Sequence, residues 1–248
     1  MIEAEGLTKI YGSLAAVSDL SFRVEGGEVL GLVGPNGAGK TTTLRCLVGI
    51  IPPTRGEIRI CGHSLGQEPL AAKRNIAFLP DEPRLFDYLT VKEHLRFTAR
   101  IYGVRDFQTP AETLLAELEL REKADALPAE LSRGMKQKLV IACGLLHSPR
   151  VLLFDEPLTG LDPIGIRRMK STILKRAREG AAIIVSSHLL HLVEEICDRV
   201  LILNQGRKII HGTLEEIQRS LPDLRGDISL EDMFLRITGH AEDGTEMK

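Results

Sequence analysis

The amino-acid sequence predicts an α/β fold with a parallel-sheet core, an N-terminal layer rich in β-strands and an inserted lobe of helices. Short apolar runs typical of buried strands recur along the chain, at residues 29–33, 76–79, 151–154 and 182–186. Segments with a helical spacing of apolar residues separate these runs, which is the pattern of a parallel sheet. Between about 91 and 144 the pattern is helical throughout, and this block predicts the inserted lobe.

The other elements follow in chain order. Residues 20–24 alternate apolar and polar side chains, as a half-buried strand does, and a turn at 25–28 precedes the next strand. In the inserted lobe one helix is expected from Val91 and another from about Thr109–Pro110. The remaining expected elements are helices over 40–48, 163–178 and 190–197, a strand over 57–60, and a hairpin of strands 200–203 and 208–211 around 204–206.

Charge and composition disfavour two classes of protein. The formal net charge of −2 argues against a nucleic-acid partner, because nucleic-acid binders usually carry a clear basic excess. No apolar run approaches the roughly 20 residues that a membrane-spanning helix needs. The N-terminus also lacks a basic segment followed by an apolar run, so no signal peptide is expected. If the protein serves transport, another polypeptide supplies the pore.

A glycine-rich loop between the strand at 29–33 and the helix at 40–48 matches the phosphate-loop pattern G-x-x-x-x-G-K-[ST] at every fixed position. Glycines let backbone N–H groups curl around phosphate oxygens, and the helix N-terminus adds the positive end of its dipole. Lys40 is expected to reach the β- and γ-phosphates, and the Thr41 hydroxyl suits Mg²⁺. We therefore predict a P-loop NTPase that binds ATP and Mg²⁺ through Gly34, Pro35, Asn36, Gly37, Ala38, Gly39, Lys40, Thr41 and Thr42. A dinucleotide-binding site is excluded, because its motif is G-x-G-x-x-G and Thr42 stands at the position of the third glycine.

The apolar strand at 151–154 runs directly into two carboxylates, Asp155 and Glu156. In a P-loop protein the first acid at such a strand end holds Mg²⁺, directly or through water. The second acid can accept a proton from the attacking water as a general base. Alone, the Asp-Glu pair equally fits a solvated strand end; the phosphate loop upstream favours the hydrolytic interpretation.

A third motif, L-S-R-G-M-K-Q at residues 131–137, stands shortly before that strand. It resembles the L-S-G-G-x-x-Q signature of ATP-binding-cassette (ABC) ATPases. The order of phosphate loop, helical insertion, signature and Asp-Glu strand is similar to that family as well. So are Leu161–Asp162 after the strand and Ser187–His188 at the end of the next one. The resemblance covers roughly residues 1–221, nearly the whole chain.

This resemblance implies a RecA-like parallel-sheet core, an antiparallel β subdomain at the N-terminus and an α-helical subdomain. The cassette would occupy residues 1–221, with the helical subdomain inserted at about 82–148. Residues 222–248 would form a C-terminal helix and a disordered tail.

The resemblance also implies roles for single residues. Ser132 and Gly134 would begin a helix and face the γ-phosphate held by a second subunit, so that ATP lies between two subunits; Ser132 can equally be a helix N-cap. His188 would hydrogen-bond the γ-phosphate and orient the attacking water. Asp162 matches the loop that crosses the dimer interface, and Tyr11 matches the aromatic residue that stacks on adenine.

Two positions depart from the family pattern. Arg133 replaces the first glycine of the signature pair. After the strand at 76–79 the family usually has a Gln that touches Mg²⁺ and the attacking water, whereas this chain has Pro-Asp-Glu-Pro. Asp81 is the best match to that Gln and Glu82 the second. A carboxylate can bind Mg²⁺ but cannot donate a hydrogen bond when ionised, so Asp81 is expected to contact the metal.

The expected protein is an ATPase that dimerises on ATP, as a homodimer, and drives transport through a separate integral-membrane permease from the cytoplasmic face of the membrane. In the resembled family, the region of Phe86, Tyr88 and Leu89 forms a groove that receives a helix of the membrane subunit. Segments 79–83 and 229–235 resemble cassettes of export-type permeases of the ABC-2 class. Met233, Phe234 and Ile237 alternatively form the apolar face of a docked C-terminal helix. The transported substrate cannot be read from the chain, because the pore subunit selects it.

Soluble cassette ATPases and small-molecule kinases fit the sequence less well. A soluble cassette ATPase for DNA repair or chromosome structure would carry long heptad coiled coils, but the insertion here is short and contains Pro110 and Pro128. Translation ATPases of this kind usually carry two cassettes in one chain, and this chain has one. A P-loop kinase for a small molecule would leave the signature unexplained.

Overall fold

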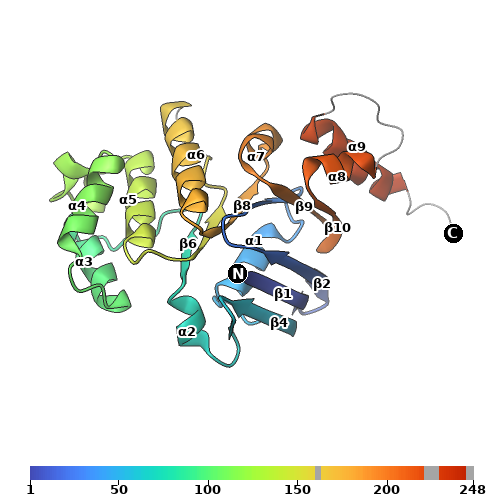
Figure 1. Ribbon diagram of the computed structural model, residues 1–248, viewed down its shortest axis with the longest axis horizontal. Helices are drawn as coiled ribbons and strands as arrows, with labels where there is room; N and C mark the ends of the chain where they lie inside the picture. Colours follow the sequence, from blue (N-terminus) through green and yellow to red (C-terminus); the bar gives the residue numbers. More distant parts are fainter. Residues whose placement is uncertain (160–162, 221–228, 244–248) are drawn as a thin grey trace.

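Two β-sheets of different construction share one hydrophobic core in the computed structural model, which describes residues 1–159, 163–220 and 229–243 (Figure 1). The first sheet is antiparallel and has the strand order β2-β1-β4-β5. The second has the order β10-β9-β3-β8-β7-β6, and its pairs are parallel except β10 with β9. The predicted fold class, a parallel-sheet core with an N-terminal antiparallel layer, is confirmed.

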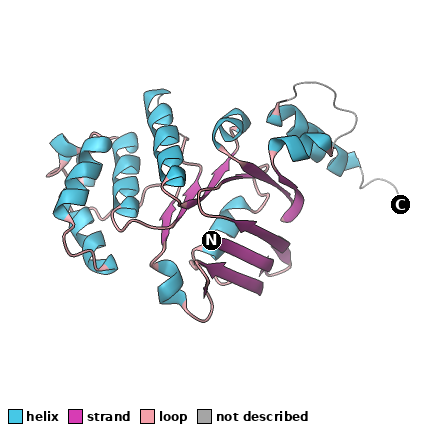
Figure 2. Ribbon diagram, in the orientation of Figure 1, coloured by secondary structure: helices cyan, strands magenta, loops and turns pink. Residues whose placement is uncertain are grey.

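The bounds of the elements agree closely with the sequence pattern (Figure 2). The first sheet comprises β1 (Ile2–Tyr11), β2 (Leu14–Val24), β4 (Arg55–Ile60) and β5 (His63–Ser64). The second comprises β3 (Val29–Val33), β6 (Ile76–Leu79), β7 (Val151–Asp155), β8 (Ala182–Ser187), β9 (Arg199–Asn204) and β10 (Arg207–Gly212). The helices are α1 (Lys40–Leu47), α2 (Pro69–Lys73), α3 (Val91–Tyr102), α4 (Gln108–Glu117), α5 (Arg133–Leu145), α6 (Pro163–Arg178), α7 (Leu190–Ile196), α8 (Leu214–Arg219) and α9 (Leu230–Asp243), with 3₁₀ turns η1 (Arg121–Lys123) and η2 (Pro128–Glu130).

The parallel sheet is buried on both faces, which is why its strands are apolar at nearly every position. Leu30 and Leu153 face the core that α1 shares with the antiparallel sheet. Leu152 and Phe154 point the other way, into the core built by the helices that follow. Helix α7 packs so closely on β3 that a Cβ at Gly31 would lie 2.4 Å from Cγ1 of Val193.

Helices α3, α4 and α5 form the predicted inserted lobe, at the left of Figure 1. The chain leaves the sheet at the end of β6 and returns to it at β7. A capping box at Thr90 and Glu93 begins α3. Helix α4 starts at Gln108, one residue before the predicted Thr109, and ends at Glu117, so Leu120 lies beyond it, buried in the following turn. The short helices α2 and α8 were not predicted.

The C-terminal helix α9 packs on α7 and α8. Leu230 and Met233 are buried there and Phe234 packs against the same cluster, as expected for a docked helix; the side chain of Ile237 lies outside the described residues. The helix extends to Asp243, within the segment 222–248 that was expected to form a helix and a disordered tail. Residues 244–248 are outside the described residues. None of the described helices is long and apolar enough to span a membrane.

Candidate active site

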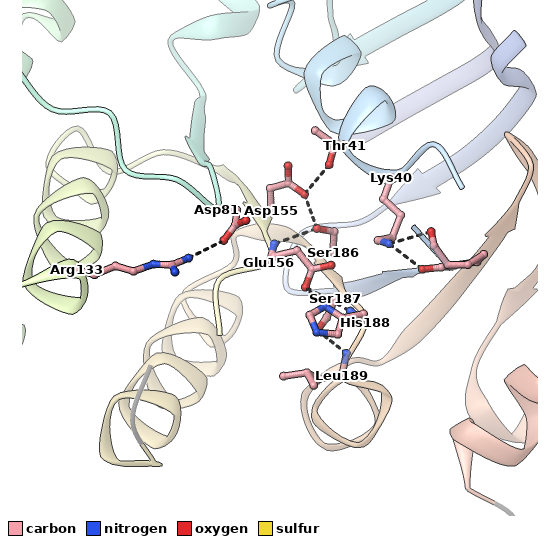
Figure 3. A network of polar contacts seen from close by, with 12 residues as sticks. Lys40, Thr41, Asp81, Arg133, Asp155, Glu156, Ser186, Ser187, His188 and Leu189 are labelled. Carbon is pink, nitrogen blue, oxygen red and sulfur yellow. Dashed lines mark hydrogen bonds and ion pairs between the residues drawn. The ribbon is translucent and has the colours of Figure 1, made fainter. Parts of the chain in front are cut away.

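The register of three parallel strands brings the predicted site residues to one edge of the sheet. Val33, the last residue of β3, lies opposite Ser187 of β8, and Asp155, the last residue of β7, lies opposite Ser186. The phosphate loop, the Asp-Glu pair and the serines before His188 therefore meet where the strands end (Figure 3). This edge is where α/β sheets generally bind their ligands.

Two glycines at the fixed positions of the motif set the shape of the phosphate loop. At Gly34 a Cβ would lie 2.4 Å from the carbonyl oxygen of Leu203. At Gly39, whose φ is +102°, it would lie 2.5 Å from the carbonyl oxygen of Ala16. Neither position has room for a side chain, and the second also needs a left-handed backbone. The loop is thus held between the end of β9 and β2.

The amino group of Lys40 is buried against this loop. Nζ donates hydrogen bonds to the carbonyl oxygens of Gly34 at 2.7 Å and Pro35 at 3.3 Å. Burial lowers the pKa of Lys40, and the charges of Glu156 and Asp155 oppose part of that shift. An ammonium group has three N–H donors, so Lys40 can donate to a ligand oxygen as well.

Asp155 is buried at the end of β7, and two hydroxyls donate to its Oδ1. The Oγ1–Oδ1 distance from Thr41 is 3.3 Å, and the Oγ–Oδ1 distance from Ser186 is 2.7 Å. These oxygens fit Mg²⁺, which binds hard oxygen ligands at about 2.1 Å in octahedral geometry, so that neighbouring ligands are about 3 Å apart. Thr41 and Asp155 are the residues that would hold the ion.

Glu156 is held in an unusual conformation. Its φ of +50° lies in the left-handed region, which non-glycine residues rarely adopt. Its N–H donates to both Oγ and the carbonyl oxygen of Ser186, at 3.1 and 3.2 Å. Its Oε2 accepts from the backbone N–H of His188 at 3.3 Å and lies 2.8 Å from Nδ1 of the same residue. The two predicted catalytic side chains therefore form one pair (Figure 3).

The signature residues lie at the start of α5. Ser132 is the N-cap, and its Oγ accepts from the N–H of Met135 at 3.3 Å, as expected for a helix cap. Gly134 lies in the first turn. The side chain of Arg133 points to Asp81, with 3.6 Å between Nη2 and Oδ1. The structure thus places Asp81 against the signature helix, a contact that the sequence did not suggest.

The remaining predicted residues lie around the loop. Asn36 and Pro35 are exposed, Ala38 is buried and Thr42 is in the first turn of α1. Tyr11 ends β1 with its ring half exposed, and Nζ of Lys9 lies 5.0 Å from the ring centroid. Asp162 lies outside the described residues.

Ser186 and Gln137 have structural roles that the sequence analysis missed. Ser186 holds both Asp155 and Glu156, and the side chain of Gln137 donates to the carbonyl oxygen of Pro80 at 3.4 Å. A polar residue near the end of an otherwise apolar strand is the signal that could have identified Ser186.

Together the loop, the buried lysine and the strand-end carboxylates have the arrangement expected of the nucleotide site of a P-loop ATPase. Comparison with known proteins agrees. The family model described as ABC transporter matches residues 17–159. The ATP-binding protein EcsA of Bacillus subtilis is 32% identical over 240 residues, which are 96% of each chain. The Nod factor export ATP-binding protein I of Paraburkholderia xenovorans is 39% identical over 213 residues, 85% of this chain and 70% of that one.

A solved structure described as the ATP-binding subunit of an ABC transporter is 37% identical and superposes with a TM-score of 0.91, over 96% of this chain and 99% of the other. The chain belongs to the ABC transporter family. It is an ATP-binding subunit of that family, and its activity is ATP hydrolysis.

Replacing Ser186 with Ala tests the strand-end network. Asp155 would lose its shortest hydrogen bond, from a buried hydroxyl, so the free energy of unfolding should fall by about 1–3 kcal/mol. Denaturant titration measures this. Ser171→Ala is the matched control, because that exposed hydroxyl donates only within its own helix, to Arg167. Equal stability of the two variants would contradict the account.

Proposed function

We propose that this chain hydrolyses ATP as one of two identical copies on the cytoplasmic face of a membrane, and that the cycle drives export through a separate integral-membrane permease. The observation that carries the proposal is the contact of Glu156 with both Ser186 and His188 beside the phosphate loop. Ser186 fixes the backbone N–H of Glu156 and His188 holds its carboxylate, and a carboxylate held in this way, one residue after a buried Asp, suits a base that acts on water.

In this proposal the loop N–H groups and Lys40 bind the ATP phosphates. Thr41 and Asp155 would hold Mg²⁺, and Asp81 would contact it as well. When bound, the ion neutralises charge on the phosphate oxygens. Oxygen ligands of this kind, completed by substrate phosphates and water, are what Mg²⁺ usually takes, and no larger cluster of metal-binding side chains occurs among the described residues.

Glu156 acts as general base and His188 positions it. Because an ionised carboxylate only accepts hydrogen bonds, the backbone N–H and the ring of His188 orient Oε2, and the other oxygen remains for the attacking water. The ring of His188 is half exposed, so it can also meet a phosphate. These contacts would fix the direction of proton transfer before water arrives.

The second copy completes the site. Ser132 and Gly134 at the N-terminus of α5 would cover the γ-phosphate bound to the partner, where N–H groups and the helix dipole favour an anion. Asp162 would lie at the same interface, and Tyr11 would stack on adenine.

Export and a permease partner are supported by the relatives and by one surface of the chain. The Nod factor relative is named for export. A groove of about 230 Å³ between the helical lobe and β6 is lined by aromatic rings, including Phe86, Phe97 and Tyr102. Tyr88, two residues after Phe86 in the chain, is 92% exposed. Exposed aromatic residues around a groove are typical of a site that receives a helix.

Glu156→Gln tests the base and the dimer together. Gln keeps the shape and the hydrogen-bonding ability of the side chain but lacks a basic oxygen, so hydrolysis should fall about a hundred- to ten-thousand-fold. ATP should still bind, and a dimer that depends on MgATP should accumulate. Size-exclusion chromatography with light scattering, with and without MgATP, measures this. Hydrolysis at the wild-type rate would refute the assignment of the base.

The control for dimer geometry is Ser132→Arg in the Glu156→Gln background. The added bulk and charge lie at the N-terminus of α5 and not on the phosphate loop. MgATP should therefore bind without forming a dimer. If the Glu156→Gln protein dimerises equally with and without Ser132→Arg, the dimer interface does not include the signature residues.

Tyr88→Ala tests the docking surface. Truncating a central aromatic residue of an interface typically costs about 2 kcal/mol or more, roughly a thirtyfold loss of affinity. Recovery of the membrane protein that co-purifies with the tagged wild-type chain from solubilised membranes should fall accordingly, with ATP binding unchanged. Leu14→Ala, which truncates an exposed apolar residue of the β1–β2 hairpin, is the control. Equal recovery with both variants would argue against this surface.

A further inference from the structure

The two residues that depart from the family pattern meet each other in the structure. Arg133 begins α5 and Asp81 lies two residues after β6, and Nη2 of the first is 3.6 Å from Oδ1 of the second. In Figure 3 the arginine extends from the N-terminus of α5 to the loop that carries the carboxylate. The Gly and Gln of the family pattern could not form an ion pair, so this contact belongs to the present sequence.

One carboxylate oxygen of Asp81 depends on Arg133 for charge compensation. Oδ1 is shielded from solvent and has no hydrogen-bond partner among the described residues, although the side chain as a whole is 43% exposed. The ion pair with Arg133 is therefore the interaction that compensates its charge. A shielded oxygen without such a partner would be costly, because it loses water and gains no donor.

The same loop is tied to the helical lobe at two further points. Gln137, one turn along α5 from Arg133, donates from Nε2 to the carbonyl oxygen of Pro80 at 3.4 Å. The N–H of Phe86 donates to Nε2 of His94 on α3 at 3.0 Å. The segment between β6 and α3 is thus attached to α5 at one end and to α3 at the other.

We propose that Arg133 is a positioning residue for Asp81, and that their ion pair makes the loop 80–89 and the signature end of α5 move as one unit. The inference rests on the proposed role of Asp81 at the metal. Within one chain the pair connects that chain's own phosphate site to the surface that covers the partner's ATP. The loop then continues to Phe86 and Tyr88, so the same unit reaches the docking surface.

Hydrogen exchange of the full chain without nucleotide tests the coupling. The variants are Asp81→Asn, Arg133→Gln and the double variant, because Asn has the shape of Asp, Gln is a shorter polar side chain than Arg, and both remove the charge. The amide of Phe86 donates to His94 of α3 and that of Leu89 to the carbonyl oxygen of Phe86, so their exchange reports opening of the loop. Each single variant should speed their exchange by roughly two- to fivefold, the effect of an exposed ion pair. The double variant should exchange no faster than either single one.

Conservative and distant controls separate positioning from general destabilisation. Arg133→Lys keeps a cation and should restore most of the protection that Arg133→Gln loses. Arg59→Gln breaks the exposed pair with Glu57 on β4 and should leave Phe86 and Leu89 unchanged. Raising the salt concentration from about 0.05 to 0.5 M should speed exchange in the wild type but not in Arg133→Gln, because salt screens exposed charges.

Two outcomes would overturn the inference: unchanged exchange at Phe86 and Leu89 in the single variants, or effects that add in the double variant. The metal role is tested separately, by hydrolysis. If Asp81→Ala hydrolyses ATP normally in the assembled transporter, that role fails, whereas the exchange cycle still decides whether Arg133 and Asp81 are coupled.

Discussion

The parallel pairing of β3, β8 and β7 is the constraint on which the rest of the structure depends. Its register sets Val33 opposite Ser187 and Asp155 opposite Ser186, so one sheet edge carries the phosphate loop, a carboxylate pair and two hydroxyls. A slip of one residue would turn every side chain of a strand to the opposite face. Burial of both faces of the sheet by α1 and by the later helices prevents such a slip, because alternate residues belong to different cores.

That edge concentrates charges that a protein interior tolerates poorly, and the local structure compensates each of them. Lys40 has two loop carbonyls, Asp155 has two hydroxyls, and Glu156 has the N–H and ring of His188. The left-handed backbone of Glu156 is a local cost, of order 1–3 kcal/mol, at the residue whose carboxylate meets His188. The polar network and the strained backbone of Glu156 occur together at the predicted active site. Functional sites often hold residues in backbone conformations that are unfavourable on their own.

Much of this could be predicted from the sequence, for reasons that differ between elements. The strand at 29–33 and the helix at 163–178 were predicted with their observed bounds, because buried parallel strands are apolar throughout and long helices repeat their apolar positions. The phosphate loop was predicted from the G-x-x-x-x-G-K-[ST] motif, whose glycines and lysine have known roles in binding phosphate. Helices α2 and α8 were missed because five or six residues are too few to show a period. The contact between Arg133 and Asp81 could not be foreseen, since 52 residues separate them and only the fold of the helical lobe brings them together.

The central claim is that the loop beside these strand ends is the nucleotide site, and its most direct test is calorimetric titration of MgATP into wild-type protein and Lys40→Met. Met fills similar space but donates no hydrogen bond and carries no charge, so affinity should fall at least about tenfold, since hydrogen bonds to charged groups contribute about 1.5–3 kcal/mol. Lys73→Met is the matched control, because Nζ of Lys73 also donates to a loop carbonyl, that of Gly49 at 3.0 Å, but beyond the C-terminal end of α1, whereas Lys40 begins that helix. The account predicts weak binding by Lys40→Met alone. Equal affinity of the wild type and Lys40→Met would contradict it.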